Sequence, residues 1–157
     1  MTNKLIYLAV SIIGLIILGI IIFLLILIPT NRKLVSPTPP LEKITYKNAS
    51  PDLITVETPY SGAVTGKEFT VTGKARGTWY FEASFPLQIL DKNGKVLVAI
   101  PAQAQSDWMT ENFVPFKATI KVPSTYIGPA TLVLRKDNPS GLPEHEASIS
   151  FPITIEY

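Results

Sequence analysis

The sequence has no cysteine and a single histidine. Without cysteine the chain forms no disulfide, no zinc thiolate site and no cysteine nucleophile, and it offers no residue for a bacterial lipoprotein anchor. His145 stands between two glutamates, and we interpret it as a solvated loop residue because one histidine alone cannot build a zinc site. Stability must therefore come from the hydrophobic core, which is feasible for a domain of about 100 residues.

A large excess of charge of either sign is also missing. The chain carries 14 basic and 12 acidic side chains, a formal net charge of +2. A nucleic-acid-binding domain needs a basic face, so this near balance argues against a nucleic-acid partner. The regular oxygen-ligand spacing of a calcium-binding loop is absent as well, and we expect no cofactor.

One long hydrophobic run lies near the amino terminus. Residues 5–28, from Leu5 to Ile28, are 24 positions without a charged side chain. A helix of that length is about 36 Å long, enough to cross a hydrocarbon core of about 30 Å. We therefore predict that residues 1–28 form a short tail and one transmembrane helix, with membrane lipid as its partner. A cleaved signal peptide or a buried core helix is less consistent with the length, the missing A-x-A pattern and the missing polar face.

The charges that flank this run give a weaker indication of orientation. Lys4 precedes it, whereas Arg32 and Lys33 follow it, so the positive-inside count alone places the downstream side in the cytoplasm. The amino-terminal tail is short, however, and the downstream part has the features of an extracytoplasmic module. We predict a single-pass protein of the cell membrane whose carboxy-terminal domain is extracytoplasmic.

A proline-rich stretch follows at residues 29–51 and contains five prolines. Proline fixes φ and lacks an amide proton, so this composition predicts an extended linker of the polyproline type and no packed structure. A proline-rich ligand for an SH3-type domain is the alternative. The linker is expected to hold the domain at residues 52–157 away from the bilayer.

Hydrophobic alternation with a period of two predicts β-strands throughout residues 52–157. Phe69, Val71, Gly73 and Ala75, for example, alternate with polar side chains. Seven such runs are expected, at residues 53–57, 69–76, 79–90, 95–100, 113–122, 130–135 and 147–157. Seven strands with one apolar face each close best as two packed sheets, so the predicted fold class is an all-β sandwich.

Five short motifs within this domain carry a family resemblance. They are Gly73-x-Ala75 and the segments WYFEASF at 79–85, DWMT at 107–110, FVPF at 113–116 and NPSGLPE at 138–144. Together they resemble the immunoglobulin-like domain associated with bacterial spore-germination proteins, the second of the GerMN-associated domains. The resemblance spans about Ile54 to Tyr157 and implies a bacterial, extracytoplasmic, seven-stranded immunoglobulin-like β-sandwich. It supplies no catalytic residues, and no companion GerMN domain is recognised in the sequence.

Aromatic residues are the first candidate contacts for a ligand. Trp79, Tyr80 and Trp108 would together make a platform on which a sugar ring can stack. Large aromatic residues at strand ends also pack between sheets with the indole N–H bonded nearby, so a core role is the alternative.

Acidic residues are the second set of candidates. Glu82 falls within the expected strand at 79–90, on the face opposite the large apolar side chains, where a carboxylate must be exposed or paired. Arg76 or Lys117 would serve as its partner. Alternatively, Glu82, Asp107 and Glu111 would gather round a calcium ion, which takes several oxygen ligands.

The candidate surface for a partner is one end of the predicted sandwich. Recognition is usually placed on loops that a rigid scaffold holds in position. The candidate positions there are Asn138, Ser140 and Gly141, together with the turn at Asp107 and Trp108.

These features predict a non-enzymatic binding or scaffolding module of a bacterial cell surface, with an unknown protein or a cell-wall component as its partner. A carbohydrate- or peptidoglycan-binding module that uses exposed tryptophans is the alternative. An enzyme with a Ser-His-Asp triad would need His145, and the sequence has no nucleophile-elbow motif to accompany it.

Overall fold

The computed structural model describes residue 23 and residues 43–157, and nearly all regular structure in them is β-strand. The predicted transmembrane helix, apart from Phe23, and most of the predicted linker lie outside the described residues. Within the described part, no helix is long and apolar enough to span a membrane. The strands are β1 (Thr45–Lys47), β2 (Ile54–Thr58), β3 (Val64–Thr65), β4 (Glu68–Arg76), β5 (Ser84–Asp91), β6 (Val96–Ala104), β7 (Phe113–Lys121), β8 (Gly128–Arg135) and β9 (Ser148–Ile155), with two 3₁₀ turns, η1 (Gly77–Trp79) and η2 (Pro143–His145).

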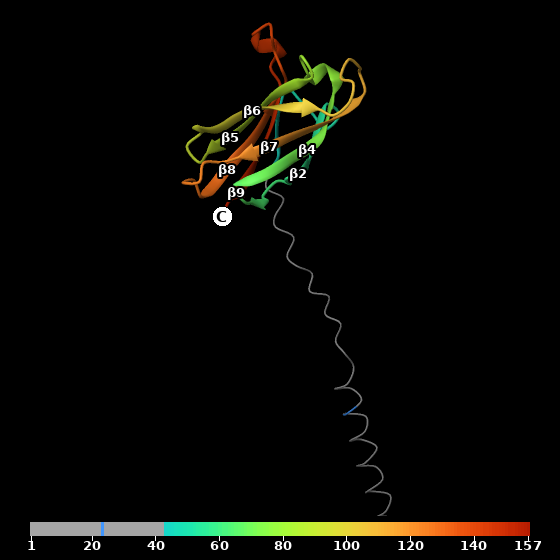
Figure 1. Ribbon diagram of the computed structural model, residues 1–157. Helices are drawn as coiled ribbons and strands as arrows, with labels where there is room; N and C mark the ends of the chain where they lie inside the picture. Colours follow the sequence, from blue (N-terminus) through green and yellow to red (C-terminus); the bar gives the residue numbers. More distant parts are fainter. Residues whose placement is uncertain (1–22, 24–42) are drawn as a thin grey trace, which may run out of the picture. The chain divides into compact units, whose positions relative to one another are not determined.

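These strands form one mainly antiparallel sheet that curls on itself (Figure 1). The strand order is β1-β9-β8-β5-β6-β7-β4-β2, and the short β3 pairs in parallel with β9. β6 joins the two halves of the curl, because it pairs with β5 along most of its length and with β7 only at Gln103 and Ala104. The all-β prediction is confirmed. We expected seven strands in two packed sheets, whereas the described residues form one continuous sheet of nine strands.

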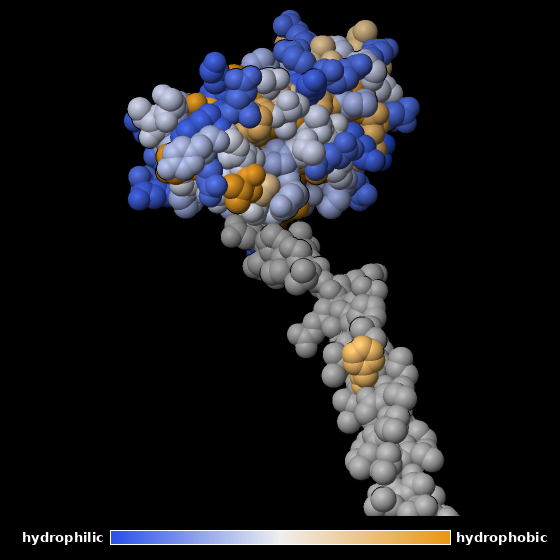
Figure 2. All heavy atoms as spheres, turned by 60° about the horizontal axis from the view of Figure 1, so that its bottom comes forward, coloured by the Kyte–Doolittle hydropathy of each residue, from blue (hydrophilic) through white to orange (hydrophobic). Residues whose placement is uncertain are grey.

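The core lies inside the curl, where alternate residues of each long strand meet. β9 illustrates the pattern, since Ile149, Phe151, Ile153 and Ile155 are buried and alternate with half-buried residues. Burial of each such side chain contributes about 1.5–3 kcal/mol to folding. On the face drawn in Figure 2, hydrophilic side chains predominate and hydrophobic ones occupy small separate areas.

Aromatic side chains fill the middle of this core. The Phe85 ring centre lies 6.3 Å from that of Trp79, 5.0 Å from that of Tyr80 and 5.1 Å from that of Phe116. All three pairs have the edge-to-face geometry that aromatic quadrupoles favour, which adds about 0.5–1.5 kcal/mol per pair to the burial term. Trp79 ends η1, the turn that follows β4, and Tyr80 comes next, so this cluster fixes the path of the chain as it leaves the sheet.

The predicted strand at residues 79–90 is wrong in its first part. The chain leaves β4, makes the turn η1, and reverses at residues 81–84 before β5 begins. Glu82 and Ala83 have φ angles of 49° and 62°, a left-handed backbone that closes this tight turn. The continuous alternation of aromatic and small residues conceals the turn in the sequence.

β1 lies within the stretch predicted to be an unpacked linker. Its three residues pair antiparallel with β9, with Tyr46 opposite Ile149. Tyr46 is half-buried and packs against the core. The linker prediction is therefore wrong for residues 45–47, and the folded unit begins before the predicted boundary at residue 52.

Three prolines stand inside long strands, where the missing N–H is tolerated only at an edge or a bulge. Pro86 precedes the β5 residues that pair with β8, and Pro152 lies between the β9 residues that pair with β1 and with β3. Pro115 pairs with β4 on one side, whereas β6 reaches β7 only at the next two residues. Each proline thus occupies a local edge of the sheet.

Candidate functional site

Three loops gather at one end of the curled sheet, which we call the loop end: residues 77–83, 105–112 and 136–147 (Figure 1). The middle loop, 77–83, is bound to both of the others. The Gly77 amide donates to the Asn112 carbonyl at 3.1 Å, and the Asp137 amide donates to the Trp79 carbonyl at 3.0 Å. The loop end is therefore one connected surface, and it holds all the candidate residues of the sequence analysis.

Gly77 makes this close approach possible. A Cβ atom at this position would lie 1.8 Å from the Thr110 carbonyl oxygen and 2.4 Å from that of Trp108. Both are backbone atoms that a rotamer change cannot move away. Glycine is therefore required where η1 rests on the 105–112 loop.

Trp79 is 2% exposed and lies in the core cluster. Its Nε1 atom is buried and has no hydrogen-bond partner among the described residues. The interpretation of Trp79 as a surface platform for a ligand is therefore wrong, and the core alternative is right. The sequence could not distinguish a ligand-binding role from a core role for Trp79, because a large aromatic residue beside a loop is compatible with both.

Tyr80 fastens the end of η1 to β7. Its ring is buried, and its hydroxyl donates to the Val114 carbonyl at 2.8 Å. Burial raises the pKa of the Tyr80 phenol far above its ordinary value, because the low-dielectric core disfavours the phenolate. Tyr80 is thus a neutral structural anchor beneath the loop end.

Glu82 is exposed at the tip of the turn that the Phe81 and Ser84 backbones close with bonds of 3.0 and 3.1 Å. The prediction that Glu82 lies in a strand is wrong. Glu82 forms no ion pair within the described part of the chain. Arg76, a predicted partner, instead donates to the backbone carbonyls of Asp52 and Glu111 at 2.9 and 3.4 Å. Glu82 is free to contact a partner.

Asp107 organises its own loop. Its Oδ1 accepts a hydrogen bond from the Met109 amide at 3.1 Å, which closes a turn around Trp108. Trp108 is half-buried against the core, whereas Met109 is 77% exposed. Among residues 43–157 no three acidic or histidine side chains cluster in a way that would hold a metal, so the calcium alternative has no site there.

The 136–147 loop is held by its own side chains. The Asn138 amide group donates to the Leu142 carbonyl at 2.8 Å, and the Ser140 hydroxyl donates to Asn138 Oδ1 at 2.6 Å. His145 Nδ1 lies 3.0 Å from the same hydroxyl oxygen. Gly141 has a φ of 66°, the left-handed conformation that suits glycine in this turn. The motif NPSGLPE therefore specifies a shaped loop.

The Ser140 and His145 pair does not form a nucleophile and its base. The Ser140 proton is directed to Asn138 Oδ1, so His145 Nδ1 must donate its own proton to the Ser140 oxygen. A general base would have to accept the serine proton instead. The contact therefore stabilises the loop.

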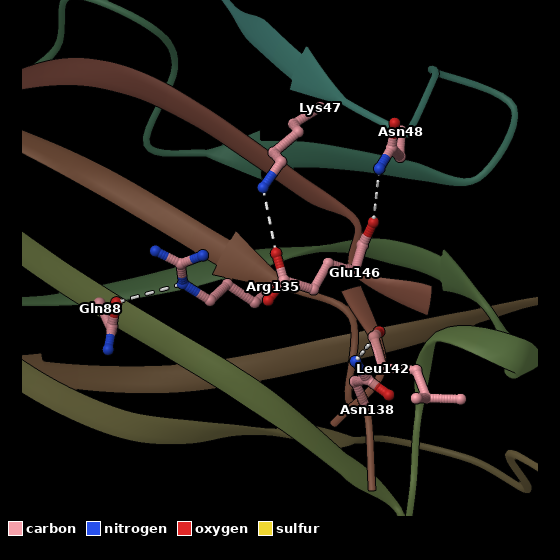
Figure 3. A network of polar contacts seen from close by, with 7 residues as sticks. All are labelled: Lys47, Asn48, Gln88, Arg135, Asn138, Leu142 and Glu146. Atoms are coloured by element: carbon pink, nitrogen blue, oxygen red, sulfur yellow. Dashed lines mark hydrogen bonds and ion pairs between the residues drawn. The ribbon is translucent and has the colours of Figure 1, made fainter. Parts of the chain in front are cut away.

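β1 braces the base of this loop (Figure 3). The Lys47 ammonium group lies 3.0 Å from the Glu146 carboxylate, and the Asn48 amide group donates to the Glu146 carbonyl at 3.0 Å. On the neighbouring strands, Arg135 Nε donates to Gln88 Oε1 at 3.4 Å. The ion pair is exposed and contributes less than about 1 kcal/mol, so its main effect is to position the loop.

A groove of about 360 Å³ separates the 136–147 loop from the turn at residues 78–81. Phe81, 45% exposed, and Lys136 line it together with Asn138, Ser140 and His145. The sequence analysis missed Phe81 and Lys136, because Phe81 was assigned to the inward face of a strand that is in fact a turn. Leu142, 46% exposed, adds an apolar side chain at this end of the molecule.

Tyr126 lies just before β8, and immunoglobulin-like sandwiches often contain a structural tyrosine, the tyrosine corner. Its hydroxyl donates to the Pro129 carbonyl, downstream in the chain. In a tyrosine corner the hydroxyl bonds to backbone upstream. Tyr126 is therefore not a corner of that type.

Comparison with known sequences identifies the domain. A search of curated proteins finds no match. The sequence model of the Gmad2 family, the immunoglobulin-like domain of bacterial spore germination, matches residues 53–142, which is more than half of the chain. This match confirms the resemblance that the motifs indicated. The chain therefore belongs to the Gmad2 family of immunoglobulin-like domains.

Proposed function

We propose that this chain is a non-enzymatic binding or scaffold module, fastened in a bacterial cell membrane through residues 5–28 and displaying its Gmad2 domain outside the cytoplasm. The observation that carries the proposal is the loop end, where the 77–83 loop is bonded to both of the other loops and borders, with the 136–147 loop, a groove of about 360 Å³. The loops are fixed before a partner arrives, so little conformational entropy is lost on binding.

The chemistry of the groove suits a partner that is partly apolar and partly polar. Phe81 supplies exposed apolar surface in the groove, while Lys136 and Asn138 supply charge and hydrogen-bonding groups there. Leu142, in the 136–147 loop, adds exposed apolar surface at the same end of the molecule. Interface centres commonly combine an aromatic anchor with a polar rim. This mixture supports a protein or peptide partner more than a bare sugar.

The sugar-binding alternative depends on tryptophan. The sequence has two tryptophans, and burial of Trp79 leaves Trp108 as the one that could contact a ring. Titration of wall polysaccharide against intrinsic tryptophan fluorescence tests this alternative. A spectrum that is unchanged at saturating polysaccharide would reject it.

Site-specific crosslinking in cells tests the main proposal. A photoreactive amino acid at Leu142 should give a discrete crosslinked species in the cells that make the protein. The same group at Asn93 is the control, because Asn93 lies in the turn at the far end of β5 from the loop end. Equal products at both positions, or none at Leu142, would contradict a binding role for the loop end.

Protease accessibility tests the proposed orientation. Protease added to intact cells, after removal of any outer barrier, should digest the domain at 52–157. Complete protection until the cells are lysed would place the domain in the cytoplasm.

A further inference from the structure

The outer face of β4 and β7 carries a row of cations that the loop end does not use. The two strands pair in register from Glu68 opposite Lys121 to Arg76 opposite Phe113. Residues opposite each other in an antiparallel pair share a face, and their neighbours, such as Val71 and Ala118, are buried. Four cations therefore project from the same outer face, which we call the basic face: Lys74, Arg76, Lys117 and Lys121.

Three cations of the basic face are spaced regularly along the strands, and the fourth lies at twice that spacing. Lys74 lies two residues from Arg76, and Lys117 stands opposite Thr72, two residues farther. At about 3.4 Å per residue, these steps are about 7 Å each. Lys121 lies four residues beyond Lys117, so the row extends for roughly 27 Å along the strand direction.

Acidic side chains neutralise this row only at one end. Glu68 lies 4.0 Å from Lys121, and both side chains are more than half exposed, so the pair is weak. Lys74, Arg76 and Lys117 form no ion pair with any described residue. Besides Glu68, the strands β2, β4 and β7 contain one more acidic residue, Glu57 of β2, which lies where the pairing of β2 with β4 is irregular.

Two of the cations converge on one aromatic ring. The Lys74 ammonium group lies 5.1 Å from the Phe113 ring centre, and the Arg76 guanidinium group lies 4.2 Å from it. The backbone carbonyls of Asp52 and Glu111 hold the guanidinium group in place. Like charges are thus kept together without a carboxylate between them, an arrangement that an external anion would stabilise.

We propose that the basic face binds a linear polyol-phosphate chain of the cell envelope. Charge complementarity supports a polyanion, because cations arranged in a row along the strands can contact several phosphates of one flexible chain. Lysine ammonium groups and the Thr70 and Thr119 hydroxyls, at register positions of the same face, are suitable donors to phosphate oxygens. Only the placement of the polymer outside the cell rests on the proposed function.

Two other anionic partners fit the basic face less well. Single-stranded nucleic acid is usually bound by stacking its bases on aromatic rings, and the Phe113 ring is already covered by two cations. An anionic membrane surface is usually engaged with the help of inserted apolar side chains. The exposed large hydrophobic side chains of the described residues include none from β4 or β7.

The test uses the full-length chain in phosphatidylcholine nanodiscs and a fluorescent poly(glycerol phosphate) oligomer, with binding followed by anisotropy. The K74Q/K117Q variant should bind about tenfold more weakly at about 50 mM salt, and the salt slope of log K should fall by about 1.5. The matched control is K92Q/K95Q, which removes two exposed cations from the β5–β6 turn. The control should bind within about twofold of the parent.

Several results would overturn the proposal. They are an unchanged affinity in K74Q/K117Q, and a loss of equal size in K92Q/K95Q. Tighter binding of single-stranded DNA with the same number of phosphates would indicate a nucleic-acid site, and flotation with phosphatidylglycerol vesicles that K74Q/K117Q abolishes would indicate a membrane-surface site. Unchanged circular dichroism and thermal midpoint in both variants, as expected for exposed positions, confirm that a loss of binding is not a loss of fold. Crosslinking at the loop end is independent of all these results.

Discussion

Replacement of Tyr80 by phenylalanine should weaken the domain at neutral pH and have a smaller effect in alkali. The substitution keeps the ring in the core but removes the 2.8 Å hydrogen bond to the Val114 carbonyl. A buried carbonyl left without its donor costs about 1–3 kcal/mol of unfolding free energy. At pH 7 the Y80F variant should therefore be less stable by about that amount.

The pH dependence follows from the raised pKa of the Tyr80 phenol in the folded state. The unfolded chain ionises Tyr80 near pH 10, whereas the folded chain keeps it neutral, so the parent loses stability as the pH rises above 10. One pH unit above the ordinary value, this loss is about 1.4 kcal/mol. Y80F has no hydroxyl to ionise, so the stability difference between the two proteins should shrink by about that amount at pH 11.

Urea unfolding followed by tryptophan fluorescence at several pH values between 7 and 11 measures this difference. The control is Y60F, because the Tyr60 side chain is 57% exposed and lies outside the core. A difference between parent and Y80F that stays constant from pH 7 to 11 would refute the argument. It would mean that the Tyr80 hydroxyl is accessible to solvent in the folded domain.

Substitutions at three further positions test the anchoring of the loop end and of one turn. G77A should lower the unfolding free energy by about 1–3 kcal/mol, because the added Cβ atom collides with backbone oxygens of the 105–112 loop. A thermal midpoint equal to that of the parent would contradict this. W79A should cost about 3–5 kcal/mol in urea unfolding because it leaves a cavity. W79F should cost clearly less, because it keeps an aromatic ring in the core and breaks no hydrogen bond of the indole N–H, which has no partner among the described residues; losses of equal size would contradict this. Hydrogen bonds from backbone N–H groups, above all that of Lys95, lower the pKa of Asp91 in the folded state, so its carboxylate contributes stability above its ordinary pKa and loses this contribution as the pH falls. The D91N variant should therefore lose less stability than the parent between pH 7 and 3. Parallel curves of unfolding free energy against pH for the two proteins would argue against this.

The sequence predicted most of the fold because burial imposes a period of two on the strands. The alternation at β7 and β9 located those strands within a few residues, and the NPSGLPE motif predicted a loop. β1 was missed because three residues are too few to show a period, and its pairing with β9 depends on contacts 99 or more residues away in sequence, such as that of Lys47 with Glu146.

The candidate site was predicted less completely for a different reason. Asn138, Ser140 and Gly141 were placed correctly, since asparagine, serine and glycine have local turn chemistry that sequence displays. The roles of Trp79 and Glu82 depend on the left-handed turn at residues 82–83, which the local sequence pattern does not predict. The basic face was hidden too, because its cations are far apart in sequence and become neighbours only through the register of β4 with β7.

The short strand at the start of the domain gives it a mechanical polarity. β1 and β9 run antiparallel, with Thr45 opposite Ser150 and Lys47 opposite Ser148. A tether pulling ahead of Thr45 and a captured partner pulling through the loop before Ser148 would slide these strands lengthwise past each other. The hydrogen bonds between the two strands would then all be loaded at the same time instead of breaking one after another. The contacts of Glu146 with Lys47 and Asn48 would carry part of the load. A module attached in this way should withstand traction along its length better than a peeling force applied across it.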